Sequence, residues 1–168
     1  EFLRGVHNPV GIKIGPTHNL DDIKRIVDIL NPDNEWGRLV IITRFGKDQI
    51  AEYLPDLIRN FRIEGYRVLW SCDPMHGNTY TSESNFKTRK FDDILSEIKR
   101  FFEIHRAEGS IPGGIHFELT GRDVTECIGG GQEIMDHHLE HNYATSCDPR
   151  LNARQSRYDE EAAGEILL

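Results

Sequence analysis

RLVIITRFG, the stretch at residues 38–46, decides the fold class. Its four consecutive apolar residues are typical of a strand in a parallel sheet that is covered by helices. Three other stretches have the same character, and each carries a charged residue or a histidine near its C-terminal end. They are VGIKIG at 10–15, YRVLWSCDPMHG at 66–77 and GGIHFELTG at 113–121. The four stretches predict four parallel strands.

Helical patterns of apolar residues lie between these strands. The first helix is expected to begin at Asn19 or Asp21, which are good capping residues. The second contains Pro55, which we expect to kink the helix or to lie in its first turn. A long polar loop at 77–90 precedes the third helix. A short helix around 132–140 and a second loop at 142–152 follow the last strand.

Strands that alternate with helices form either an open doubly wound sheet or a (β/α)8 barrel. In the last strand His116, Glu118 and Thr120 share one face, and the other face is apolar. A polar inner face and an apolar outer face favour the barrel. We therefore predict an α/β fold of the (β/α)8 TIM-barrel type. A complete barrel needs about 250 residues, so the four βα units make about half of one. Residues 1–168 are predicted to form a single unit, in which residues 156–168 are a tail without an assigned role.

The composition excludes some classes of partner. Lys and Arg number 20 against 28 Asp and Glu, a net charge of −8, which argues against general nucleic-acid binding. No apolar run approaches the roughly 20 residues that span a bilayer, so we expect no membrane partner. Three cysteines without a scaffold-like spacing indicate reduced thiols in a cytosolic setting.

Four chemically active residues stand at the predicted strand ends: Lys13, Arg44, His76 and Glu118. Parallel α/β proteins build their active sites at this end of the strands. Two cations suit a phosphate or carboxylate, whereas His and Glu suit a divalent metal. The pattern indicates a metal-assisted reaction on an anionic substrate. Residue types alone also allow other roles. Lys13 and Arg44 can be ordinary paired cations, and His76 can be a structural histidine. Glu118 can form a salt bridge to Lys13 or Arg44.

Five ordered motifs resemble those of the class II (plant and mycobacterial type) 3-deoxy-D-arabino-heptulosonate 7-phosphate synthases. The motifs are GIKIGPT (11–17), ITRFG (42–46), CDPMHGNT (72–79), HFELTGRDVTECIGG (116–130) and SCDPRLN (146–152). The resemblance implies the C-terminal half of a (β/α)8 barrel. It also implies a transferase that needs a divalent metal and condenses phosphoenolpyruvate with erythrose 4-phosphate, the first step of the shikimate pathway to aromatic amino acids.

The resemblance also implies roles for individual residues. His76, Glu118 and Asp148 match metal ligands, although Asp-Pro is also common turn chemistry. Lys13 and Arg44 match residues that bind phosphoenolpyruvate. The metal expected is Mn²⁺, with Co²⁺, Fe²⁺ and Zn²⁺ as alternatives. The family's cysteine ligand has no counterpart here. We expect the ligand atoms of the three metal residues to lie within about 5 Å of one another.

Two alternatives remain open. The chain can be an inactive fragment or a subunit that requires a partner, because half a barrel leaves open strand edges. The partner would be the N-terminal half of the barrel, and the complete enzyme is expected to be a homo-oligomer in the cytoplasm, or in the plastid of a plant. Another metal-dependent barrel aldolase of keto acids is the weaker alternative, because the five motifs argue against it.

Overall fold

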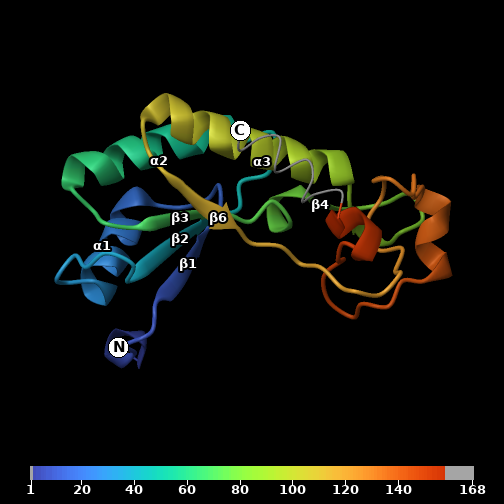
Figure 1. Cartoon of the computed structure of the whole chain (residues 1–168), viewed down its shortest axis with the longest axis horizontal. Coiled ribbons are helices and arrows are strands. Elements are labelled where there is room, and N and C mark those ends of the chain that lie inside the picture. The colour runs from blue at the N-terminus through green and yellow to red at the C-terminus, as the bar shows by residue number, and fades with distance from the viewer. Residues whose placement is uncertain (1, 158–168) are drawn as a thin grey trace.

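The structure, a computed structural model, describes residues 2–157. Four parallel strands form one sheet in the order in which they occur along the chain, as predicted (Figure 1). They are β1 (Val10–Ile14), β2 (Leu39–Thr43), β3 (Leu69–Cys72) and β6 (Pro112–Ile115). The chain is therefore a mixed α/β protein with a parallel four-stranded sheet. Most of the tail predicted at 156–168 lies outside the described residues.

Three α-helices accompany the sheet. They are α1 (Leu20–Leu30), α2 (Ile50–Glu64) and α3 (Phe91–Glu108), and a 3-10 helix, η1 (Phe2–Gly5), precedes β1. The Asn19 side chain caps α1 by accepting hydrogen bonds from the amides of Asp21 and Asp22. Pro55 lies inside α2 and not in its first turn. None of the helices in residues 2–157 has the length and apolarity needed to cross a bilayer.

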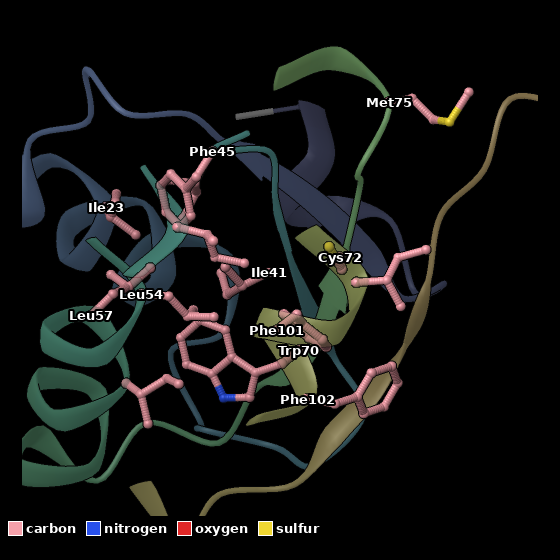
Figure 2. Packing of buried hydrophobic residues seen from close by; sticks show 14 of the residues in the cluster. Ile23, Ile41, Phe45, Leu54, Leu57, Trp70, Cys72, Met75, Phe101 and Phe102 are labelled. Atoms are coloured by element: carbon pink, nitrogen blue, oxygen red, sulfur yellow. The ribbon is translucent and has the colours of Figure 1, made fainter. Parts of the chain in front are cut away.

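The core lies on the helical side of the sheet. Leu39, Ile41 and Thr43 of β2 are buried, whereas the residues between them are only half-buried. This alternation sends one face of the strand toward the helices. Figure 2 shows Ile41 and Trp70 from the strands packed with Phe101 from α3. Helices α2 and α3 run across this side of the sheet, where they contact each other (Figure 1).

The other side of the sheet is more open, and we call it the open face. It is formed by Lys13, Val40, Ile42 and Leu69. Val40 and Ile42 are half-buried, and 45% of Leu69 is exposed. In a closed barrel this side of the strands would face the interior. The apolar residues on the open face are therefore only partly covered by the described residues.

The last strand is shorter than predicted, because β6 ends at Ile115. The ladder stops here because its neighbour β3 ends at Cys72 and the chain then turns at Asp73-Pro74. The final hydrogen bond of this pair runs from the His116 amide to the Cys72 carbonyl oxygen, 2.7 Å. The chain then leaves the sheet and runs toward the β4–β5 region (Figure 1). The predicted alternation beyond Ile115 therefore does not lie within a strand.

The polar loop predicted at 77–90 contains regular structure. After a short 3-10 helix, η2 (His76–Asn78), the strands β4 (Thr79–Thr81) and β5 (Lys87–Arg89) form an antiparallel hairpin. The short helix predicted around 132–140 is a 3-10 helix, η3 (Asp136–His141). Polar composition concealed the hairpin, since its strands are too short to show an apolar repeat.

Candidate metal and substrate site

His76, Glu118 and Asp148 come together from three separate segments. His76 begins η2 after β3, Glu118 follows β6, and Asp148 lies in the loop at 142–152. Each offers one ligand atom, and these three atoms all lie within 4.8 Å of one another. His76 Nε2 lies 3.2 Å from Glu118 Oε1. The structure therefore shows the convergence that the sequence led us to expect.

Asp73 fixes the orientation of the His76 ring. His76 Nδ1 donates to Asp73 Oδ2 at 2.7 Å, which leaves Nε2 facing Glu118. The Asp73 side chain is fully buried, and its Oδ1 accepts the amides of Met75 and His76 at 3.0 and 3.2 Å. Burial tends to raise the pKa of Asp73, but the hydrogen bond from Lys13 and the interactions with His76 outweigh it and hold that pKa below its ordinary value. The sequence interpretation missed Asp73, whose Cys-Asp-Pro triplet resembled simple turn chemistry.

Lys13 reaches the same carboxylate. Its Nζ lies 2.7 Å from Asp73 Oδ2, and 38% of its side chain is exposed. This contact provides the compensation that a lysine within an apolar strand requires. Lys13 and His76 therefore both bind the Asp73 carboxylate. Among the described residues, Lys13 does not form the salt bridge to Glu118 that the sequence allowed.

Arg44 follows β2 on the open-face side. Lys13 pairs with Ile42, and Arg44 lies two residues beyond Ile42, so Lys13 and Arg44 share one face. A Cβ atom placed on Gly15 would lie 3.5 Å from Arg44 Cζ, which shows how closely the guanidinium approaches the backbone there. The residue is exposed, and its guanidinium forms no ion pair or hydrogen bond within residues 2–157. It is therefore available for an anionic ligand.

Glu97 holds together the two loops that carry Arg44 and His76. Its buried carboxylate accepts the amides of Phe45 and Gly46 at 3.0 and 2.9 Å and the Asn78 side-chain amide at 2.7 Å. Burial raises the pKa of Glu97 to about 7, although these hydrogen bonds oppose the effect. Gly46 adopts φ 84°, and a Cβ atom there would lie 2.6 Å from the Gly77 carbonyl oxygen. Only glycine allows the two loops to approach this closely.

Arg89 is a further charged residue of the site that sequence reasoning missed. It ends β5 and is fully buried, with Nη1 2.8 Å from Glu118 Oε2 and Nη2 3.7 Å from Asp148 Oδ1. Arg89 also donates to Thr79 Oγ1 at 2.9 Å and to the Pro149 carbonyl oxygen. Within residues 2–157, Glu118 Oε2 and Arg89 Nη2 have no hydrogen-bond partner, so the pair at 2.8 Å is a contact of charges without hydrogen-bond geometry. No motif in the polar loop pointed to this arginine.

Asp148 is half-buried, like the other two candidate ligands. Lys87 Nζ contacts Asp148 Oδ1 at 2.6 Å, and the hydrogen bond from Lys87 is the main cause of a lowered pKa at Asp148. Its loop is anchored by the buried Glu126, which accepts hydrogen bonds from the amide, Nε and Nη2 of Arg150. Arg150 is therefore engaged in holding the loop.

The three candidate ligands fit a divalent metal. His76 Nδ1 donates to Asp73, so in a neutral ring Nε2 carries a lone pair that faces the Glu118 carboxylate. Two lone pairs 3.2 Å apart repel each other, so this approach of Nε2 to Glu118 Oε1 is favourable only with a proton or a cation between the two atoms. One nitrogen and two carboxylates form a donor set that manganese, iron, cobalt and zinc accept.

A cavity of about 370 Å³ opens beside the cluster. It is lined by Phe117, Glu118, Leu119, Thr145, Cys147, Asp148 and Arg150. Its size is suited to a small ligand. His116, which the alternation placed on the same inner face as Glu118, is exposed. All three cysteines are free, and Cys147 Sγ donates to Asp148 Oδ2 at 3.3 Å.

Comparisons with known proteins show the family to which the chain belongs. The class-II DAHP synthetase family model matches residues 1–159, where DAHP is 3-deoxy-D-arabino-heptulosonate 7-phosphate. A phospho-2-dehydro-3-deoxyheptonate aldolase of Streptomyces coelicolor is 51% identical over 156 residues, which cover 93% of this chain and 35% of the relative. Aldolases of the same name from Mycolicibacterium smegmatis and Neurospora crassa are 48% and 47% identical, over 92% and 93% of this chain and 33% of each relative.

A parallel α/β sheet with a cluster of possible metal ligands near the carboxyl ends of its strands defines a class of α/β proteins that build their sites at these ends. Within that class, this chain belongs to the class-II DAHP synthetase family. The chain spans about a third of the length of the curated relatives it matches.

Proposed function

We propose that the chain supplies part of the active site of a 3-deoxy-7-phosphoheptulonate synthase. The reaction condenses phosphoenolpyruvate with erythrose 4-phosphate and opens the shikimate pathway to aromatic amino acids. Membership of the family supports this proposal, and the observation that carries it is the convergence of His76, Glu118 and Asp148 within 4.8 Å. A site for an anion lies next to this cluster, because Asp73 connects Lys13 to His76.

His76, Glu118 and Asp148 would hold the metal, most suitably Mn²⁺, with Co²⁺, Fe²⁺ or Zn²⁺ as alternatives. When bound, such an ion supplies Lewis-acid polarisation of a carbonyl oxygen. Asp73 keeps the proton on Nδ1 of His76 and so leaves Nε2 free to act as a ligand. Arg89 offsets the two carboxylate charges from the buried side.

Lys13 and Arg44 bind phosphoenolpyruvate. The ammonium of Lys13 provides a point charge and the guanidinium of Arg44 a planar fork for two oxygens. Together they orient the enol carbon toward the aldehyde of erythrose 4-phosphate, with which it forms the new carbon–carbon bond. Water adds to the carbon that carries the phosphate ester, and inorganic phosphate leaves. Much of the acceleration comes from fixing two anionic reactants in one geometry.

The test is an assay of the purified chain with Mn²⁺ and both substrates, alone and mixed with a polypeptide that supplies the rest of the barrel. Phosphorus NMR follows the conversion of phosphoenolpyruvate into inorganic phosphate. We expect turnover in the mixture, and its loss when His76 is replaced by glutamine. A mixture that forms the complete assembly but consumes no phosphoenolpyruvate would refute the proposed activity.

A second candidate is a subunit that is inactive until a partner completes the barrel. The open face supports it, because 45% of Leu69 is exposed and Val40 and Ile42 are only half-buried. The sheet also ends at β1 and β6 within the described residues, and each is an edge that another strand can extend. In the assay above, the chain alone would then show weak metal binding, self-association and no turnover. Turnover by the monomeric chain would exclude this candidate.

A further inference from the structure

Asp73 joins the two parts of the proposed site, the candidate metal ligands and the candidate substrate-binding cations. Its Oδ2 accepts hydrogen bonds from Lys13 Nζ and from His76 Nδ1, both at 2.7 Å. Its Oδ1 is held by the amides of Met75 and His76. The side chain is fully buried, so water does not compete for these contacts. A single oxygen atom is therefore shared by Lys13, a candidate substrate-binding residue, and His76, a candidate metal ligand.

The shared oxygen sets the tautomer of His76. A carboxylate only accepts hydrogen bonds, so the His76 proton facing it lies on Nδ1. Nε2 is then the atom directed at Glu118 and at the cluster. A histidine that binds a metal through one nitrogen is commonly oriented in this way by an acceptor at the other.

The same oxygen limits the freedom of Lys13. While Asp73 Oδ2 holds the Lys13 ammonium, part of that charge is neutralised before any anion arrives. A cation bound at His76 Nε2 withdraws electron density from the ring and makes its Nδ1–H a stronger donor. The His76–Asp73 hydrogen bond then strengthens, the hold of Asp73 on Lys13 weakens, and Lys13 becomes a better partner for an anionic substrate.

We propose that Asp73 is a positioning residue that couples metal binding to phosphoenolpyruvate binding through its shared Oδ2. The inference rests on the proposed function and adds a thermodynamic link between its two binding events. Coupling between two sites is reciprocal, so phosphoenolpyruvate strengthens metal binding by the same factor as the metal strengthens phosphoenolpyruvate binding.

Asp73→Asn tests this link with little change in volume. An asparagine oxygen can still accept the two backbone amides, but its NH2 group then faces His76 and Lys13 as a donor. The His76 proton should move to Nε2, where it opposes a metal ion. We expect Mn²⁺ affinity to fall about 10–100-fold, the usual effect of losing such an orienting group. Ser71→Ala is the matched control, because Ser71 lies two residues earlier in β3 on the same side of the strand.

Three measurements on the 168-residue chain decide the question. Electron paramagnetic resonance of free Mn²⁺ gives the metal Kd, and calorimetry gives the phosphoenolpyruvate Kd with and without Mn²⁺. Nitrogen NMR of labelled histidines, with His76 assigned by comparison with His76→Gln, gives the tautomer without metal. We expect Nδ1–H in the unsubstituted chain, Nε2–H in Asp73→Asn, and a ratio of phosphoenolpyruvate Kd values that moves toward one in that variant only.

The outcomes separate this inference from the proposed function. An unsubstituted chain that binds Mn²⁺ and phosphoenolpyruvate, beside an Asp73→Asn variant with the same Kd values and the same ratio, would overturn the role of Asp73 alone. An Nε2–H tautomer of His76 in the unsubstituted chain would overturn it even if Asp73→Asn fails to fold. Absence of Mn²⁺ binding by the unsubstituted chain would count against the metal site itself, and therefore against both proposals.

Discussion

Arg89 and Glu118 form a charge pair in which the arginine is completely buried and the carboxylate is 26% exposed, with Nη1 2.8 Å from Oε2. The arginine comes from the hairpin and the glutamate from the segment after β6. The pair therefore fixes these two segments against each other beside the candidate metal ligands.

Replacing Arg89 should destabilise the fold strongly. Arg89→Met leaves Glu118 and Asp148 without their buried counter-charge, and removal of one partner of a buried pair costs about 3–5 kcal/mol. The partial exposure of Glu118 places the expected loss near 3 kcal/mol. Lys87→Met is the control, because half of the Lys87 side chain is exposed and a surface pair contributes less than about 1 kcal/mol. Urea unfolding measures both, and equal losses would contradict a structural role for Arg89.

Mn²⁺ should stabilise the chain through His76. At a concentration about 100 times its Kd, a ligand that binds only the folded state adds about 2.7 kcal/mol. For a chain of this size that corresponds to a rise in Tm of roughly 5–10 °C. His76→Gln should abolish the rise, whereas His116→Gln should retain it, because His116 is exposed and outside the cluster. Differential scanning calorimetry with and without a chelator makes the comparison, and an unchanged rise in His76→Gln would remove His76 from the site.

Arg44→Lys should weaken phosphoenolpyruvate binding. The substitution keeps the charge but loses the planar fork, and a hydrogen bond between charged groups contributes about 1.5 kcal/mol, so the Kd should increase roughly tenfold. Arg25→Lys on the exposed side of α1 provides the control for an ordinary surface arginine. Calorimetric titration with phosphoenolpyruvate measures both variants. A Kd that does not change in Arg44→Lys would place Arg44 outside the substrate site.

Glu97 and His105 should give stability profiles of opposite slope. Burial raises the pKa of Glu97 from 4.5 to about 7, so the stability that it contributes is lost as pH rises through this interval. Burial lowers the pKa of His105 from 6.5 to about 4, so its contribution is present above pH 6.5 and is lost as pH falls. Around pH 5–6 the two slopes oppose each other in the unsubstituted chain.

Single substitutions should separate these two slopes. The free energy of unfolding of Glu97→Gln should increase with pH between about 5 and 6.5, whereas that of His105→Gln should decrease. Three other carboxyl groups affect the pH dependence of stability only below this interval, because their pKa values are lowered; they belong to Asp73, Glu126 and Asp148. Urea unfolding at several pH values gives the profiles. If both variants kept the profile of the unsubstituted chain, neither group would titrate as its burial indicates.

The sequence predicted the strands and helices that show an apolar repeat within their own residues. Four apolar stretches, their helical connections and their parallel order follow from periodicity, and His76 and Glu118 stand near the ends of strands, where ligands converge. Their roles as metal ligands, and that of Lys13 and Arg44 toward phosphoenolpyruvate, remain proposals.

The remaining features depend on tertiary neighbours. Asp73 and Arg89 matter because of the groups they meet across the fold, which are Lys13 for Asp73 and Glu118 for Arg89. β6 ends at Ile115 because β3 offers no further partner, which the regular alternation of residues 115–120 conceals. The exposure of His116 follows from the same early departure from the sheet.

The segment between Leu119 and Leu151 is closed at its base by a short parallel bridge, in which Leu151 donates to the Glu118 carbonyl oxygen and Thr120 donates to that of Leu151. The entropy lost on closing a loop grows only with the logarithm of its length. Related chains can therefore lengthen or shorten this segment at its exposed turns, such as Gly121–Arg122, with little thermodynamic penalty. The bridge would keep Glu118 and Asp148 in place while the intervening surface diverges.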